Sequence, residues 1–145
     1  MSIREATQAD LPLITSLVRE LAEYEKLAHQ AVATEADFAE SLFGPSPKAY
    51  ALIVEHDGQP AGFAIYFYNY STFLGRPGIY VEDVFVRPEF RRTASAEPCS
   101  NIWRKRRWPR NAAGWSGGCW TGTSRRSTSI AAWAPRRWTN GRCSA

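Results

Sequence analysis

The sequence predicts an α/β or α+β fold that is confined to residues 1–92. Helical periods come first and β-rich runs follow, in the order β-α-α-β-β-β, which is typical of helices packed on a sheet. The end of the fold is marked by a change of composition at residue 92. All thirteen Phe and Tyr residues precede this point, and all six Trp and all three Cys follow it.

The first predicted elements are a short strand and two helices. Residues 2–6 favour an opening strand, and Thr7-Gln-Ala-Asp10 resembles a capping box with Asp in place of Glu. Apolar residues then recur at helical spacing and predict a helix over about 10–24. A second start signal, Thr34-Glu-Ala-Asp37, predicts a short helix that Gly44-Pro45 ends.

Three strands are predicted next. Residues 50–55 are rich in β-formers, and Asp57-Gly58 after them is a strong hairpin signal. Residues 61–70 and 79–86 form the second and third strands, and residues 71–78 connect them as a loop. These strands need cover on both faces, and the two helices supply only one.

Residues 93–145 do not supply the missing cover. They contain no Leu, Val, Phe, Tyr or Met and show neither a helical nor a strand period. Residues 1–92 hold 8 basic and 13 acidic side chains, whereas the tail holds 10 basic side chains and one acidic. We expect this basic, Trp/Arg-rich tail to be disordered and not competent to fold.

Several classes of protein are disfavoured by composition. The three cysteines have neither zinc-ligand spacing nor an even count, so we expect no metal site and no disulfide framework. The lack of a signal peptide or a long apolar run favours a cytoplasmic protein with no membrane partner. Basic and aromatic residues alternate in Arg104-Lys-Arg-Arg-Trp-Pro-Arg110, which gives a nucleic-acid-binding protein as an alternative that we do not favour.

The most specific motif is Ile79-Tyr-Val-Glu-Asp-Val-Phe-Val-Arg-Pro-Glu-Phe-Arg-Arg92. It resembles the central strand of a GNAT-family N-acetyltransferase, most closely the diamine (spermidine/spermine-type) branch. Segments that support this resemblance precede the motif in the expected order: Glu20–Glu25, Thr34–Asp37, Phe43-Gly44, Gly62–Tyr66 and Tyr70–Gly75. The resemblance covers residues 1–92 and implies the N-terminal part of the GNAT fold, a mixed sheet with helices.

The resemblance implies transfer of an acetyl group from acetyl-CoA, as co-substrate, to a primary amine. The amine would belong to a small cationic substrate such as a diamine, a polyamine or a lysine-like amino acid, and the parent enzyme would be a homodimer. Glu82 matches the catalytic base, since an alkylammonium must lose a proton before it attacks a thioester. The amine pocket would be lined by Tyr24, Glu25, Ser71 and Asp83. Ser71 stands where polyamine-acetylating relatives tend to have an acidic residue, which argues against spermidine.

Acetyl-CoA would lie along the third predicted strand. The resemblance implies that the backbone of Val84, Phe85 and Val86 lines the acetyl-pantetheine arm and that one N–H polarises the thioester carbonyl. Arg91 and Arg92 would contact phosphate in the parent enzyme.

Simpler structural interpretations of the same residues stay open. Val84, Phe85 and Val86 are also ordinary core residues of a strand, and Tyr24 and Glu25 are also an exposed helix end. Glu82 and Asp83 are adjacent on a strand, so their side chains are expected on opposite faces, as a solvent-facing carboxylate and a partner at the sheet end.

The phosphate-binding motif of the family is interrupted in this chain. The family requires Arg/Gln-x-x-Gly-x-Gly/Ala, because glycines let the backbone approach the pyrophosphate at a helix N-terminus. Thr93-Ala-Ser-Ala-Glu-Pro98 contains no Gly, and Pro98 interrupts a helix. No Tyr follows Tyr80, so the expected proton donor to the leaving thiolate is also missing.

A one-base deletion after the Arg92 codon explains this interruption. When the frame is moved one base upstream, the codons of Ala94–Cys99 can encode Gly-Ile-Gly-Arg-Ala-Leu, which is the missing loop. In the same frame the codons of residues 120–123 can encode Leu-Asp-Trp-Asn and those of residues 128–134 can encode Asp-Phe-Tyr-Arg-Ser-Leu-Gly. Members of the family carry such Trp-Asn and Phe-Tyr-x-x-x-Gly segments, in this order, after the loop. The sequence therefore predicts an impaired acetyltransferase or an inactive frameshift product, and resequencing across the Arg92 codon tests the deletion.

Overall fold

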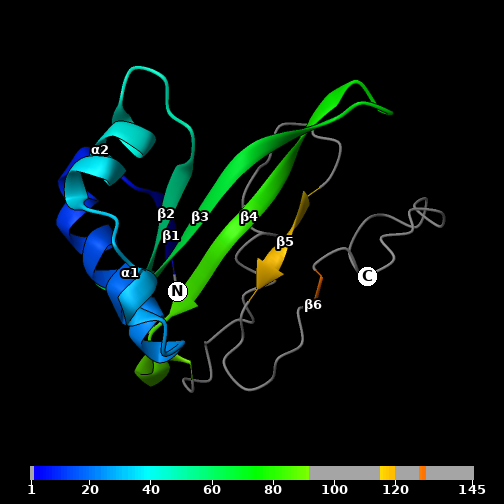
Figure 1. Cartoon of the computed structure of the whole chain (residues 1–145). Helices are drawn as coiled ribbons and strands as arrows, with labels where there is room; N and C mark the ends of the chain where they lie inside the picture. The colour runs from blue at the N-terminus through cyan, green and yellow to red at the C-terminus, as the bar shows by residue number, and fades with distance from the viewer. Residues whose placement is uncertain (1, 92–114, 120–127, 130–145) are drawn as a thin grey trace.

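The computed structural model of the chain describes residues 2–91, 115–119 and 128–129 (Figure 1). Its helices and strands appear in the order β-α-α-β-β-β over the first 91 residues, as the sequence predicts. Their bounds are β1 Ser2–Glu5, α1 Leu11–Tyr24, α2 Glu35–Phe43, β2 Tyr50–His56, β3 Gln59–Ser71, β4 Arg76–Val86, β5 Trp115–Cys119 and β6 Thr128–Ser129. Three short 3-10 turns join them: η1 Gln8–Asp10, η2 Ala28–Gln30 and η3 Pro88–Phe90.

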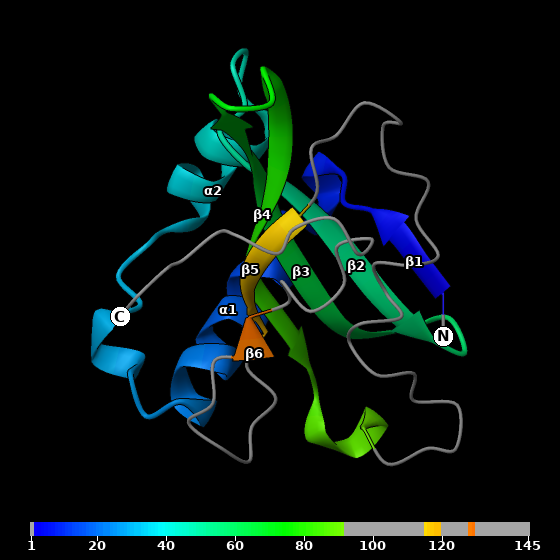
Figure 2. The same ribbon diagram turned by 90° about the vertical axis from the view of Figure 1, so that its right-hand side faces the viewer.

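The strands form one mixed sheet in the order β1-β2-β3-β4-β5-β6. The first four strands pair antiparallel, and β5 then lies parallel to β4. Both helices lie on the same side of this sheet, and β5 lies beside β4 in both ribbon views (Figures 1 and 2). The predicted α/β (α+β) class with a mixed sheet and helices is confirmed.

The β2–β3 hairpin confirms the turn that was predicted from Asp57-Gly58. Both residues have positive φ, 51° for Asp57 and 77° for Gly58, as a two-residue turn between antiparallel strands requires. The predicted loop over 71–78 is shorter than expected. The β3–β4 ladder continues to the pair Ser71–Arg76, so backbone pairing extends past Ile79, where the β-rich sequence run begins.

Two apolar clusters lie on the two faces of the sheet. The cluster under the helices joins Ile14, Leu17 and Leu21 of α1 to strand residues that include Phe63 and Phe85. The opposite face holds Leu52, Val54, Ala64, Tyr66, Ile79, Val81, Val84 and Val86, with Ile3 and Phe90 packed against it. All eight side chains are buried. The expectation that residues 93–145 leave this face uncovered falls mostly on residues outside the described ranges and stays a prediction.

Strand β5 is a second difference from the sequence prediction, which placed no strand after residue 92. Its residues Trp115–Gly117 pair with Ile79–Val81 of β4. Backbone N–H and C=O groups make this ladder, so pairing at an open strand edge does not depend on side-chain alternation. The division of the chain into a domain over 1–92 and an out-of-frame tail over 93–145 stays a prediction.

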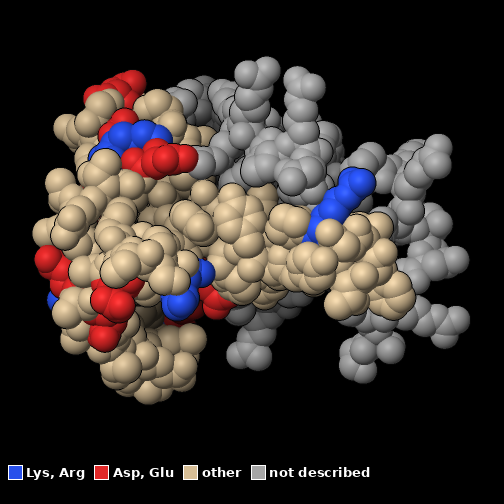
Figure 3. Space-filling view, turned by 90° about the horizontal axis from the view of Figure 1, so that it is seen from above, with Lys and Arg blue, Asp and Glu red and all other residues tan. Residues whose placement is uncertain are grey.

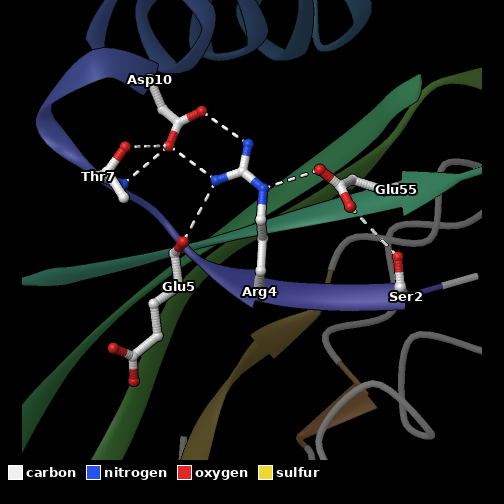
Figure 4. Close-up of polar contacts among 6 residues, drawn as sticks. All are labelled: Ser2, Arg4, Glu5, Thr7, Asp10 and Glu55. Atoms are coloured by element: carbon white, nitrogen blue, oxygen red, sulfur yellow. Dashed lines mark hydrogen bonds and ion pairs between the residues drawn. The ribbon is translucent and has the colours of Figure 1, made fainter. Parts of the chain in front are cut away.

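An ion-pair network ties β1 to the start of α1 (Figure 4). The Arg4 guanidinium donates two hydrogen bonds to the Asp10 carboxylate, at 2.7 and 2.8 Å, and a third to Glu55 at 2.7 Å. Asp10 also accepts from the backbone N–H and the hydroxyl of Thr7 at 2.8 and 2.9 Å. Arg4 therefore holds the pKa of the Asp10 carboxyl well below its usual range.

We expect Asp10→Asn to lower the free energy of unfolding by about 2 kcal/mol at neutral pH, because it leaves a buried set of charged hydrogen bonds incomplete. Since the folded pKa of Asp10 is lowered, its stabilisation is present above the ordinary value of 3.8 and is lost as the pH falls below it. Urea denaturation from pH 7 to pH 3 measures both effects. Asp37→Asn is the matched control, because Asp37 makes the same bonds to Thr34 on an exposed helix. An equal loss in both variants would contradict the role of Arg4.

Candidate functional site

A β-bulge sets the geometry of the predicted catalytic strand. Ile65 of β3 pairs with Asp83 and the next residue, Tyr66, pairs with Val81, so Glu82 is the extra residue on β4. Val81 and Val84 pack in the same apolar cluster although they are three positions apart. The expectation that Glu82 and Asp83 face opposite sides of the sheet is therefore wrong, because the bulge removes one step of the strand alternation.

The bulge places two carboxylates of different environment side by side. Glu82 is exposed, whereas Asp83 is half-buried opposite Ile65, a residue of the cluster under the helices. Burial, together with the negative charges of Glu82 and Glu25, raises the pKa of Asp83 to about 6. Glu82 and Glu25 therefore both lie close enough to Asp83 to disfavour its anion.

The C-terminal end of α1 contributes the rest of this group. The ring centroids of Tyr24 and Phe85 lie 6.3 Å apart at an angle of 57°. The Arg91 guanidinium carbon lies 4.6 Å from the centroid of the Tyr24 ring and 5.5 Å from that of Phe85, and its Nε donates to the carbonyl oxygen of Val86. Glu25, Asp83 and Glu82 thus stand next to an aromatic surface that already contacts a cation.

The strand edge predicted to receive acetyl-CoA follows the bulge. Val84, Phe85 and Val86 are buried and pair on one side with Ala64, Phe63 and Gly62 of β3. On the other side, the β4–β5 pairing ends at Val81, so within the described residues no strand pairs with that edge from Glu82 to Val86. Backbone N–H and C=O groups on this edge can form hydrogen bonds with a pantetheine arm.

Two predicted site residues do not join this group. Ser71 lies at the tip of the β3–β4 hairpin, which projects from the sheet in Figure 1, and its hydroxyl accepts from the Leu74 N–H at 3.3 Å. Its partner Arg76 is six residues from Glu82, or about 20 Å along the strand. Arg92 lies outside the described residues. The structure therefore brings together Tyr24, Glu25, Glu82, Asp83, Val84, Phe85, Val86 and Arg91.

Sequence reasoning missed the bulge and an ion pair close to the group. Arg87 donates two hydrogen bonds to Glu20 of α1, and neither residue was a predicted site residue. The bulge has no glycine or other local signal in Val81–Val84, so it was not visible in the sequence. The ion pair joins residues 67 positions apart, a separation that periodicity does not reveal.

We expect Asp83→Asn to stabilise the 145-residue chain at neutral pH by about 2 kcal/mol. The folded pKa of Asp83, about 6, lies above its ordinary value of 3.8, so ionisation costs stability as the pH rises through this interval. Well below 3.8 the carboxyl is protonated in both states and the gain should vanish. Urea denaturation at pH 7 and at about pH 3 measures this difference. A gain that is equal at both pH values, or none at pH 7, would contradict the described environment of Asp83.

Comparison with known proteins agrees with this fold. The model of the acetyltransferase (GNAT) family matches residues 14–94, more than half of the chain. The chain therefore belongs to the GNAT acetyltransferase family. The matched range begins within α1 and extends past the end of β4.

Curated relatives match the chain over a similar extent. A thialysine N-epsilon-acetyltransferase from Bos taurus is 41% identical in an alignment of length 97 that covers 61% of this chain and 56% of the relative. An L-ornithine N5-acetyltransferase from Arabidopsis thaliana is 28% identical in an alignment of length 135, gaps included, that covers 62% of this chain and 59% of that protein. The chain thus spans little more than half the length of these relatives.

Solved structures support the fold. The crystal structure of a ribosomal-protein-alanine N-acetyltransferase from Brucella melitensis biovar Abortus 2308 is similar with a TM-score of 0.63. The similarity covers 83% of this chain and 80% of that one at 18% identity. Within the described residues, no helix has the length and apolar character needed to cross a membrane.

Proposed function

We propose that the parent of this chain transfers an acetyl group from acetyl-CoA to the primary amine of a small cationic substrate. The observation that carries this proposal is the group of Glu25, Glu82 and Asp83 beside the edge of β4 with which no described strand pairs from Glu82 to Val86. In the view of Figure 3, acidic and basic side chains both lie on the helix side of the molecule, so a general acidic surface does not carry the proposal. A cationic amine would find its anionic partner in these three carboxylates, next to the backbone that would hold the acetyl donor.

Glu82 is the proposed general base. Its position at the bulge leaves it exposed, so it can accept the ammonium proton directly or through one water. Asp83 and Glu25 would hold the remaining positive charge of the substrate. Glu82 and Asp83 lie in different environments, so they suit different roles. A polar environment favours the ionised form of a carboxyl group, whereas burial raises its pKa.

Acetyl-CoA would supply an activated thioester, with its arm along Val84–Val86. Glu82 takes the ammonium proton first, and the neutral nitrogen then forms a bond to the acetyl carbon as the carbon–sulfur bond breaks. The second proton that the nitrogen loses passes to solvent and balances the proton that the leaving thiolate gains. A backbone N–H on the edge of β4 with which no described strand pairs would stabilise the developing oxyanion. The proton donor to the thiolate would be a Tyr of the restored frame, since no Tyr follows Tyr80 in this chain.

The relatives narrow the proposed substrate class. Thialysine and ornithine, which appear in the names of the two relatives, are amino acids with a side-chain amine. Ser71 pairs with Arg76 at the far end of the β3–β4 ladder, away from Glu82 and Asp83, so it does not line the same pocket as these carboxylates. The resemblance places a contact to a long polyamine at this position. We therefore propose a lysine-like or ornithine-like amine ahead of spermidine.

The test is acetyl-CoA turnover with matched amines. Lysine, thialysine, ornithine, a diamine and spermidine should be compared on the frame-restored protein and on the 145-residue chain. We expect turnover by the restored protein with the amino acids and the diamine, and strongly reduced turnover by the 145-residue chain. No turnover of any amine by a folded restored protein would refute the proposed function.

A further inference from the structure

Two contacts join α1 to the end of β4, and they are separated by a similar distance along each element. Arg87 Nε and Nη2 donate to the two carboxylate oxygens of Glu20 at 2.7 and 2.6 Å, and the Tyr24 ring meets the Phe85 ring at 6.3 Å. Glu20 and Tyr24 are one helical turn apart, a rise of about 6 Å. Phe85 lies in β4 and Arg87 directly follows its last residue, Val86, so the two are about 6.6 Å apart along extended backbone. The two spacings are similar, so the two contacts together fix the position of α1 along β4.

The same register continues to the carboxylates. Asp83 precedes Phe85 by two residues on β4, and Glu25 follows Tyr24 at the end of α1. The charge of Glu25 acts on Asp83, which shows that the two elements still face each other at this point. From Glu20 to Glu25 the helix therefore runs against β4 in the direction opposite to the strand.

The ion pair is also tied to the sheet on its far side. Arg87 Nη1 donates to the carbonyl oxygen of Pro60 at 3.0 Å, and the Arg87 N–H donates to that of Ala61 at 2.9 Å. The side chains of Arg87 and Glu20 are 25% and 31% exposed, so water screens their attraction only in part. Arg87 lowers the pKa of the Glu20 carboxyl, so Glu20 stays ionised at neutral pH.

We propose that Glu20 and Arg87 are a positioning pair, which sets the Tyr24–Glu25 end of α1 against Asp83 and Phe85. The inference rests on the proposed function for its purpose, because the positioned residues are those that would receive the amine. The pair touches neither reacting group itself. It acts by keeping Glu25 near Asp83 and by keeping the helix end over the half-buried carboxylate.

The pKa of Asp83, measured by NMR titration of the 145-residue chain, tests this inference. Glu20→Gln and Arg87→Gln each remove the ion pair. In both variants we expect the pKa of Asp83 to fall from about 6 towards its ordinary value of 3.8, because the carboxyl gains water and loses the charge of Glu25. The exchange Glu20→Arg with Arg87→Glu should restore it in part.

Glu55→Gln is the matched control, since it removes an ion pair of Arg4 at 2.7 Å that belongs to the network at the start of α1, whereas Glu20 lies in the C-terminal half of that helix. An unchanged pKa of Asp83 in Arg87→Gln would overturn the inference. An equal fall in Glu55→Gln would also overturn it, because the effect would then be a general loosening. If Arg87→Gln does not fold, Arg87→Lys keeps the charge without the two-pronged bond and should give a smaller fall.

The titration needs neither acetyl-CoA nor an amine, so its failure is distinguishable from failure of the proposed function. In a frame-restored protein that turns over amines, Arg87→Gln should raise the KM for the amine about 10-fold, with a smaller change in kcat. This division is expected of a residue that positions the binding group and takes no part in proton transfer.

Discussion

Glu82→Gln should reduce kcat/KM for the amine by about 10²–10⁴-fold in the frame-restored protein. The substitution keeps the shape of the side chain but removes the proton acceptor at the bulge. The bulge residue has no pairing partner on β3, so the amide of Gln should fit the same position without disturbing the ladder. Binding of acetyl-CoA should change little, because the proposed contacts are backbone groups of Val84–Val86. Steady-state kinetics with calorimetric titration of acetyl-CoA separate the two effects.

Glu23→Gln is the matched control for this experiment. It makes the same change of charge on the exposed side of α1, close to the site but outside the group that acts on Asp83. A loss common to both variants would indicate that net charge steers the amine and that Glu82 is no base. Near wild-type activity of Glu82→Gln at neutral pH would refute the assignment, and a large loss in Asp83→Asn alone would move the role to Asp83.

The effect of pH sharpens the choice between the two carboxylates. Asp83 has a pKa of about 6 and loses its charge in the range where many assays are run, because burial and its acidic neighbours disfavour the anion. If Asp83 only holds the cation, the KM for the amine should rise as the pH falls through 6. Asp83→Asn should remove this pH dependence of KM. In the Asp83→Asn background, Glu82→Gln should still lower kcat.

The sequence predicted the parts of the fold that depend on local signals. Thr34 and Asp37 mark the start of α2 in the structure, as their spacing predicts, and the positive φ of Asp57 and Gly58 makes the predicted hairpin turn. The strands were predicted within a few residues, because their β-rich runs coincide with the ladders of the sheet.

The parts that the sequence did not predict depend on contacts between distant residues. The bulge at Glu82 follows from the register between β3 and β4, and the residues around it have no special backbone chemistry. The raised pKa of Asp83 depends first on its burial in the folded chain and then on the charges of Glu82 and of Glu25, which lies 58 positions earlier in the chain. The strand β5 depends on backbone pairing in a segment that has no strand period. Periodicity detects one element at a time, so it misses such features.

The 145-residue chain should not bind acetyl-CoA usefully, whereas restoring one base after the Arg92 codon should produce saturable binding. A pyrophosphate needs several backbone N–H groups that converge at a helix N-terminus. Thr93–Pro98 has no glycine for that turn, and Pro98 lacks an N–H. The positive charge of the tail can attract the ligand, but without fixed donors that attraction is weak and is screened at physiological salt.

The strand edge alone should not compensate for the missing loop. Backbone groups of Val84–Val86 can hold the pantetheine arm, but Arg91 already donates to the carbonyl of Val86 and covers the rings of Tyr24 and Phe85. Entry of the arm would have to displace this contact with no phosphate interaction in return. Calorimetric titration of acetyl-CoA into both proteins at about 0.15 M salt measures the difference. Micromolar, saturable binding by the 145-residue chain would refute both the motif argument and the proposed deletion. The tail with its present sequence would then bind the phosphates, and no restored reading frame would be needed.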